Sequence, residues 1–158
     1  MIKDFSKNAK EYSTANSKLK IAIVKSNYYP DLTENLEKAC KDYLLANGVK
    51  ESNISTYTVP GSWEIPLTVK KAASSKKFDG IITFGIILKG ETYHFEMIAN
   101  ECARALMDIS LEFNIPVTLE VLAVYNLKQA EKRSMGKYNR GIEAARTLLE
   151  TIKVLSKL

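Results

Sequence analysis

Four short apolar segments alternate along the chain with longer segments of helical periodicity, and this alternation limits the fold more than any other feature. The apolar segments are Ile21–Val24, Asn53–Val59, Asp79–Phe84 and Val117–Val124. Short apolar strands that alternate with helices predict four mainly parallel strands between two layers of helices, a three-layer α/β fold. The helices are expected at residues 33–46, 66–74, 95–114, 127–133 and 142–152.

The length of 158 residues and the apolar fraction of 46% fit one domain with an ordinary core. Residues 1–18 are polar and lack the apolar centre of a signal peptide, so we expect a flexible N-terminal arm before a single domain at residues 19–158. Alternatively, the arm orders against a partner subunit. No apolar segment approaches the roughly 20 residues that cross a bilayer, which predicts a cytoplasmic protein without a membrane partner.

The two cysteines, Cys40 and Cys102, fall on the apolar faces of expected helices and lack metal-ligand spacing. We interpret them as reduced core residues. With one histidine and no cysteine cluster, the sequence predicts no metal site.

The net charge of +5 is concentrated near the C-terminus, where residues 127–158 carry eight Lys or Arg and three Asp or Glu. A basic segment can bind nucleic acid, but no binding motif or interleaved aromatic pattern accompanies these charges. We therefore expect a solvated helix face and no nucleic-acid partner, with one or two cations left to face a phosphate.

Unusual residues cluster where the expected strands end. Tyr28 follows the first strand, Gly61–Glu64 follow the second, and Lys89–His94 follow the third. Because ligands of parallel sheets bind at the carboxyl ends of the strands, the sequence predicts one binding site built from these three loops.

The third loop has the character of an anion site beside a proton carrier. His94, the only histidine, stands at the expected start of a helix, where free N–H groups and the helix dipole favour an anion. Gly90 allows close backbone approach, Thr92 adds a hydroxyl, and Lys89 and Arg133 are candidate counter-charges. Since imidazole transfers protons near neutral pH, the loop indicates chemistry on a phosphorylated small molecule. The alternative is a lone surface histidine.

Other side chains near the strand ends suit a planar heterocycle. Tyr28 and Trp63 offer flat walls, and Glu64 offers an acceptor for a ring or a polyol. The alternatives are that Trp63 fastens its turn to the core and that Glu64 only complements a helix dipole. Glu91 fits an anion pocket only if its backbone N–H binds and its carboxylate points away.

Four segments carry a resemblance to a known family: Val59–Pro66, Leu88–Phe95, Asn100–Ser110 and Asn139–Ala145. In order and spacing they resemble the 6,7-dimethyl-8-ribityllumazine synthase family, over about Ile21 to Leu155. The resemblance implies a flavodoxin-like fold and the penultimate step of riboflavin biosynthesis. In that step 5-amino-6-(D-ribitylamino)uracil condenses with 3,4-dihydroxy-2-butanone 4-phosphate, and phosphate and water leave. It implies no metal and no organic cofactor.

The resemblance also implies a role for each site residue, with His94 as the proton-transfer residue. The phosphate would lie on the N–H groups of Glu91 and Thr92, with Arg133 as counter-charge. The pyrimidine and its ribityl chain would meet Tyr28, Ser62, Trp63, Glu64, the backbone of Ile86, Ile87 and Leu88, and Leu119 across a subunit boundary.

Members of the family form pentamers or multiples of pentamers with shared sites, so the resemblance implies a homo-oligomer, and riboflavin synthase as a further partner. The chain departs from the family at several positions. Leu119 occupies a position where many members have an aromatic residue, and Glu120 one where glycine is usual. Asn27 and Lys89 replace arginine, and the region 134–138 is shorter than in many members. A non-catalytic shell that binds lumazine or flavin is the alternative function. An unrelated nucleotide-binding domain lacks its glycine-rich signature here.

Overall fold

The computed structural model describes residues 16–158. Within them, four strands form one sheet in the order β2-β1-β3-β4, and every neighbouring pair is parallel. The strands are β1 (Ile21–Ser26), β2 (Ile54–Val59), β3 (Gly80–Leu88) and β4 (Val117–Val124). The predicted α/β class is therefore confirmed.

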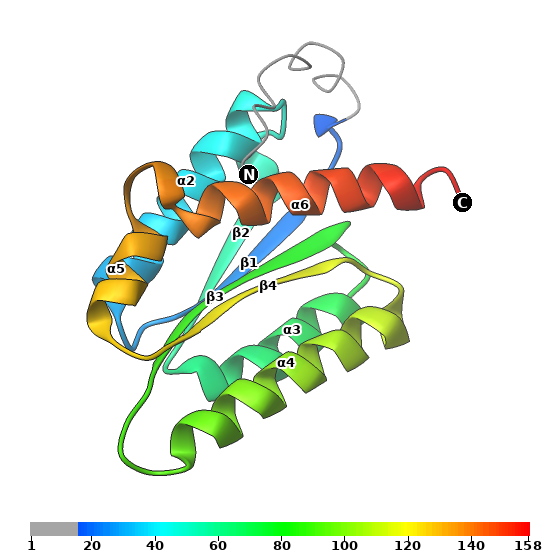
Figure 1. Ribbon diagram of the computed structural model, residues 1–158. Coiled ribbons are helices and arrows are strands. Elements are labelled where there is room, and N and C mark those ends of the chain that lie inside the picture. Colours follow the sequence, from blue (N-terminus) through cyan, green and yellow to red (C-terminus); the bar gives the residue numbers. More distant parts are fainter. Residues whose placement is uncertain (1–15) are drawn as a thin grey trace.

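Helices cover both faces of the sheet (Figure 1). On one face lie α2 (Pro30–Ala46) and α6 (Arg140–Leu155), and on the other lie α3 (Ile65–Ser74) and α4 (His94–Phe113). The buried apolar side chains divide into two clusters accordingly, one on each face. The remaining elements are short: α5 (Leu127–Ser134) and the 3-10 turns η1 (Glu51–Asn53), η2 (Ser62–Glu64) and η3 (Gly136–Tyr138).

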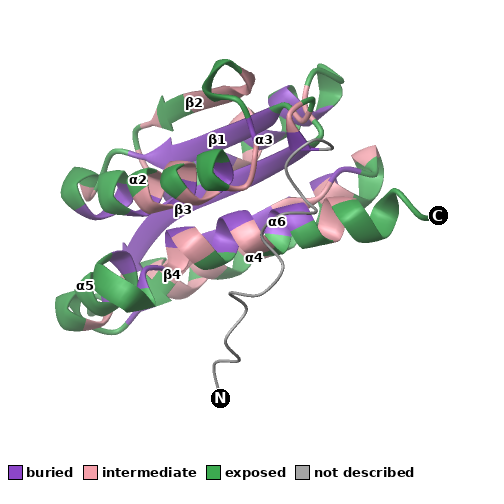
Figure 2. Cartoon of the chain, turned by 90° about the horizontal axis from the view of Figure 1, so that it is seen from above, coloured by how far each residue is buried: buried purple, intermediate pink, exposed green. Residues whose placement is uncertain are grey.

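The two central strands are almost completely buried (Figure 2). All residues of β1 and residues 80–87 of β3 are buried, because each strand has a neighbour on both sides and helices on both faces. The one hydroxyl inside β3 is satisfied, since Thr83 donates to the carbonyl of Thr118 at 2.8 Å. The apolar runs of these strands therefore arise from burial on both faces of the sheet, as the sequence predicted.

Element boundaries differ from the sequence predictions by up to four residues, and two of the largest differences have a clear cause. The predicted end of the third strand at Phe84 is wrong, because β4 continues alongside and pairs with residues 85–88 after β1 has ended. The helix expected from residue 33 begins at Pro30. Proline suits the first turn of a helix, where its missing N–H costs no hydrogen bond.

Residues 1–15 of the expected N-terminal arm lie outside the described residues. The next residues contact the domain: the Asn16 side chain donates to the carbonyl of Asn47 at 2.8 Å, and the Asn53 side chain donates to the carbonyl of Ser17 at 3.2 Å. The division of the chain at residue 18 stays a prediction.

Asn139 and Gly141 join α6 to α2. The Asn139 side-chain oxygen accepts the Gly141 N–H at 2.8 Å, and its amide donates to the carbonyls of Ser134 and Asn35 at 2.8 and 3.1 Å. A Cβ on Gly141 would overlap the carbonyl oxygen of Leu36. The two helices therefore approach at a point that admits no side chain.

A charged cluster fixes α2 to the sheet. Lys25 of β1, 9% exposed, pairs with Glu37 of α2 at 2.6 Å. Lys41 pairs with the same carboxylate at 2.5 Å, and Thr56 of β2 donates to it at 2.8 Å. Burial raises the pKa of Glu37, but these hydrogen bonds and the Lys25 charge together lower the pKa below its ordinary value.

Among residues 16–158, no helix is long and apolar enough to span a bilayer.

Candidate active site

Because the strands are parallel, the segments that follow them leave from one end of the sheet (Figure 1). This end holds the residues after β1, the turn η2 after β2, and the loop 89–93 after β3. The chain leaves β1 toward β2 on one side, while β3 pairs on the other side, so the strand order reverses between β1 and β3. We call residues 27–29, 61–64 and 86–94 the loop cluster.

The last residues of β3 give the loop cluster a backbone edge. β1 pairs with β3 only as far as Phe84, and Ile86–Leu88 pair with β4 alone. On the side where β1 has ended, alternate N–H and C=O groups of Ile86–Leu88 have no strand partner among the described residues. Backbone polar groups require partners, so this edge suits a ring that carries both donors and acceptors.

The turn η2 presents three side chains in different ways. Ser62 is buried, with a hydroxyl that has no partner in the described part of the chain. Trp63 is 57% exposed, so more than half of its surface is open to a ligand. One oxygen of the Glu64 carboxylate accepts the Gly61 N–H at 2.9 Å. Glu64 therefore stabilises its own turn and keeps its other oxygen for a ligand.

Tyr28 is also exposed at this end, at 71%, and packs edge-on against Tyr29 with ring centroids 5.1 Å apart. Three aromatic rings, those of Tyr28, Trp63 and Tyr93, thus stay accessible in the loop cluster. Large exposed aromatic side chains without a core partner are typical of ligand-stacking positions.

His94 is the first residue of α4, and its side chain is exposed. Its N–H donates weakly to the Thr92 hydroxyl at 3.5 Å. The helix start therefore lies beside the Glu91–Thr92 segment, as the anion-site prediction requires. The proton-transfer role of His94 stays a prediction.

The charged side chains of the loop 89–93 differ in whether another side chain already pairs with them. Lys89 forms an ion pair with Glu96 and lies 5.1 Å from the centroid of the Phe95 ring, so its charge is already offset. Glu91 is exposed, and no ion pair with another described residue holds its carboxylate. Its carboxylate is thus free to point into solvent while its N–H faces a ligand.

The structure places Leu119 away from the loop cluster of the same chain, and within residues 16–158 it shows no hydrogen bond or ion pair between that cluster and Arg133. Leu119 lies on β4, opposite Thr83 and five residues before the strand ends, which places it about 16 Å short of the carboxyl end. Arg133 is in the last turn of α5, where its guanidinium donates to the carbonyl of Gln129 at 3.2 Å. No hydrogen bond or ion pair within residues 16–158 joins Arg133 to residues 89–94.

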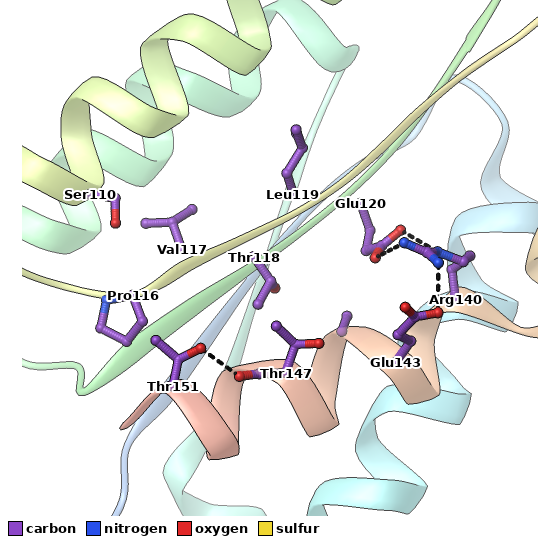
Figure 3. Close-up of a pocket in the computed structure, with 11 residues that line it drawn as sticks. Ser110, Pro116, Val117, Thr118, Leu119, Glu120, Arg140, Glu143, Thr147 and Thr151 are labelled. Carbon is purple, nitrogen blue, oxygen red and sulfur yellow. Dashed lines mark hydrogen bonds and ion pairs between the residues drawn. The ribbon is translucent and has the colours of Figure 1, made fainter. Parts of the chain in front are cut away.

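Leu119 instead lines a second feature, a pocket of about 410 Å³ between β4 and α6 (Figure 3). In it, both carboxylate oxygens of Glu120 accept N–H groups of Arg140 at 3.0 Å, and Glu143 accepts a third at 2.6 Å. We call this the β4 pocket. Sequence analysis missed it, although one signal was present: a glutamate inside the otherwise apolar end of a strand.

Glu120 and Arg140 each shift the pKa of the other. Burial raises the pKa of Glu120, against the hydrogen bonds and charge of Arg140, which lower it. The same hydrogen bonds raise the pKa of Arg140. Since Glu120 is 5% exposed, the pair accounts for how a buried carboxylate is accommodated inside the sheet.

No group of three or more His, Cys, Asp or Glu side chains converges in the described residues as a metal site would require.

The fold and the loop cluster define an α/β protein with a candidate ligand site at the carboxyl end of a parallel sheet, built from exposed aromatic rings, a free backbone edge and a helix start. A sequence profile described as 6,7-dimethyl-8-ribityllumazine synthase matches residues 18–156. The chain belongs to this family, which confirms the resemblance found in the sequence.

Individual relatives agree. A protein of Polaromonas sp. (strain JS666 / ATCC BAA-500) is 40% identical over 141 residues, which cover 89% of this chain and 90% of the relative. A protein of Methylobacillus flagellatus is 41% identical over 140 residues, 89% and 92% of the two chains. One of Campylobacter lari is 39% identical over 140 residues, 88% and 90%. All three carry the name 6,7-dimethyl-8-ribityllumazine synthase.

Proposed function

We propose that this protein condenses 5-amino-6-(D-ribitylamino)uracil with 3,4-dihydroxy-2-butanone 4-phosphate to give 6,7-dimethyl-8-ribityllumazine, phosphate and water. The observation that carries the proposal is the loop cluster, which combines stacking surfaces, a backbone edge and an anion-suited helix start at one end of the sheet. Membership of the synthase family supports the same reaction.

The pyrimidine stacks beside Tyr28 and Trp63, with its ring donors and acceptors on the free backbone edge of Ile86–Leu88. This edge is suited to the task because β1 no longer pairs there. The ribityl hydroxyls meet the buried Ser62 hydroxyl and the second oxygen of Glu64. Each of these groups has hydrogen-bonding capacity left by the fold.

The phosphate of the second substrate lies on the N–H groups of Glu91 and Thr92, at the start of α4. Free N–H groups and the helix dipole stabilise an anion at this position. A guanidinium adds a two-pronged counter-charge, which we assign to Arg133.

We infer that the site is shared between two copies of the chain. Leu119 lies away from the loop cluster of its own chain, and within residues 16–158 Arg133 has no hydrogen bond or ion pair with that cluster, so a neighbouring copy would supply both. The outer face of α4 supports association, because Met97, Met107 and Leu111 are 52%, 60% and 69% exposed. The proposed assembly is a homopentamer or a multiple of pentamers.

In the reaction, the 5-amino nitrogen attacks the ketone carbon, and loss of water gives an imine. A proton then leaves the adjacent carbon and the carbon–oxygen bond to phosphate breaks. The resulting enol tautomerises to a ketone, and the carbon that carried the phosphate becomes a methyl group. Attack by the ribityl-bearing nitrogen on this new ketone closes the ring and releases a second water. His94 moves protons during imine formation and phosphate loss. Holding both substrates in register supplies much of the acceleration.

The alternative, a shell that binds lumazine or flavin without turnover, has weaker support because the relatives are named as synthases. Riboflavin synthase, which consumes the product, is the proposed further partner. A cytoplasmic location is supported by the two buried cysteines, neither of which forms a disulfide.

The test is to mix the purified protein with both substrates and to follow lumazine formation by absorbance and fluorescence. We expect product only when protein and both substrates are present. A folded protein that binds the pyrimidine and forms no lumazine would instead establish the binding shell.

A further inference from the structure

A side chain of α4 donates a hydrogen bond to the turn that carries Ser62, Trp63 and Glu64. Cys102 is fully buried, and its thiol donates to the backbone carbonyl of Ser62 at 3.2 Å. Cys102 follows His94 by eight residues on the same helix, which is about two turns. One rigid helix thus carries the expected proton-transfer residue and touches the turn that holds the pyrimidine side chains.

The opposite side of the same turn rests on β3. A Cβ on Gly85 would lie 2.6 Å from the Ser62 hydroxyl oxygen and 3.1 Å from Cδ1 of Ile65, so only glycine lets the turn lie against the strand. Gly85 is also the first β3 residue beyond the last β1 pair, at Phe84. Ser62 is therefore held between α4 and the start of the free backbone edge.

Two further observations define the junction. Ser62 is only 7% exposed, and its hydroxyl has no hydrogen-bond partner among the described residues. A buried hydroxyl without a partner is unfavourable, so it is poised for a ligand. Burial, with the nearby charges of Glu64 and Glu101, raises the pKa of the Cys102 thiol to about 11, so at neutral pH the thiol keeps the proton that it donates.

We propose that Cys102 is a positioning residue, which sets the Ser62 turn against α4 and β3 so that the pyrimidine is held in register with His94. The proposal rests on the function proposed above for Ser62 and Glu64. Cys102 itself touches no substrate, since it is fully buried beneath the turn.

The chain offers a matched control, because its other cysteine is equally buried. Cys40 lies on α2, in the apolar cluster on the opposite face of the sheet. We would compare the wild type with Cys102→Ala, which removes the donor, Cys102→Ser, which keeps one, and Cys40→Ala. Steady-state constants would be measured separately for the pyrimidine and for the phosphorylated ketone.

In Cys102→Ala we expect KM for the pyrimidine to rise about two- to tenfold, as the loss of one hydrogen bond predicts, with KM for the ketone unchanged. Cys102→Ser recovers most of the loss, and Cys40→Ala matches the wild type in both constants. The proposal is overturned if Cys102→Ala and Cys40→Ala change both constants alike, if Cys102→Ala changes neither, or if Cys102→Ser is as impaired as Cys102→Ala.

A second readout is independent of turnover. Trp63 is the only tryptophan in the chain and lies next to Ser62, so its fluorescence reports the position of the turn. We expect acrylamide quenching of Trp63 to change in Cys102→Ala and to stay at the wild-type value in Cys40→Ala. A wild type that forms no lumazine contradicts the proposed function only; equal quenching in all variants contradicts the positioning role.

Discussion

The side chain of His94 is exposed at the first residue of α4, and it can exchange protons with substrate or solvent without moving the fold. Replacing it by alanine removes a proton carrier and leaves the elements that hold the two substrates. We expect His94→Ala to lower kcat by about a hundredfold or less, since general acid–base catalysis is one part of the acceleration. The measurement is the initial rate of lumazine formation. Complete inactivity in a folded variant that binds both substrates would contradict this.

Arg133 is expected to act on the phosphate alone. Loss of a charge-assisted hydrogen bond predicts that Arg133→Ala raises KM for the phosphorylated ketone about 10- to 100-fold, with KM for the pyrimidine unchanged. Arg133→Lys restores the charge without the planar fork and should recover part of the loss. If the KM for the ketone is the same in Arg133→Ala and the wild type, Arg133 has no such role.

At the scale of elements, the α2–α6 contact predicts that a glycine-to-alanine substitution in a helix destabilises the fold. Glycine to alanine ordinarily stabilises a helix, but at Gly141 the new Cβ meets the carbonyl of Leu36. We therefore expect Gly141→Ala to lower the free energy of unfolding by about 3 kcal/mol, measured by urea denaturation. Gly90→Ala is the control, because no atom lies within 4 Å of its added Cβ. Equal stability of the two variants would contradict the close packing.

The cluster that joins α2 to the sheet predicts a pH dependence. The folded-state pKa of Glu37 lies below its ordinary value of 4.5, so the carboxylate stabilises the fold fully above that pH and the stabilisation is lost as the pH falls through the folded pKa. Glu37→Gln should therefore be less stable than the wild type by about 1–3 kcal/mol near pH 7, and the difference should shrink below pH 4.5.

The control for this comparison is Glu112→Gln, which removes an exposed ion pair of 3.4 Å with Lys70. Surface pairs contribute little, so we expect a change of no more than about 0.5 kcal/mol. A pH-independent deficit in Glu37→Gln would show that shape, and not charge, makes the α2 contact.

Sequence reasoning succeeded for elements where the pattern is local. The alternation of apolar runs and helices predicted the layers, because burial on both faces makes Ile21–Val24 of β1 and most of β3 apolar. It failed at the end of β3, since the strand continues to Leu88 only because β4 lies beside it, and that pairing joins residues more than thirty positions apart.

The same distinction applies to the site. The sequence placed Tyr28, Trp63 and His94 at one end of the sheet because loops after parallel strands leave from the same end, which is a property of topology. The hydroxyl–strand contact of Ser62 with Gly85, the Cys102 bond and the Glu120–Arg140 pair were not predicted, because each depends on side-chain packing between distant elements. The sequence predicted that Cys102 is a core residue. That prediction describes its burial but not its hydrogen bond to the carbonyl of Ser62.

On the scale of the whole molecule, the account requires more than one chain. The loop cluster holds one part of the proposed site, and Leu119 and Arg133 lie elsewhere on the same chain. Two defective variants should therefore complement each other. One carries Glu64→Ala with His94→Ala in the loop cluster, and the other carries Arg133→Ala, so that mixed assemblies contain some sites with both halves intact.

The most direct measurement is lumazine formation by assemblies of the two variants co-expressed in equal amounts and purified through different tags, with their mass determined by light scattering. Random mixing would make roughly one quarter of the sites intact. At a ketone concentration far below the wild-type KM, the account therefore predicts activity near one quarter of the wild type, from two variants that each retain about a tenth of it or less. Mixed assemblies no more active than their components, or a fully active monomer, would contradict the shared site.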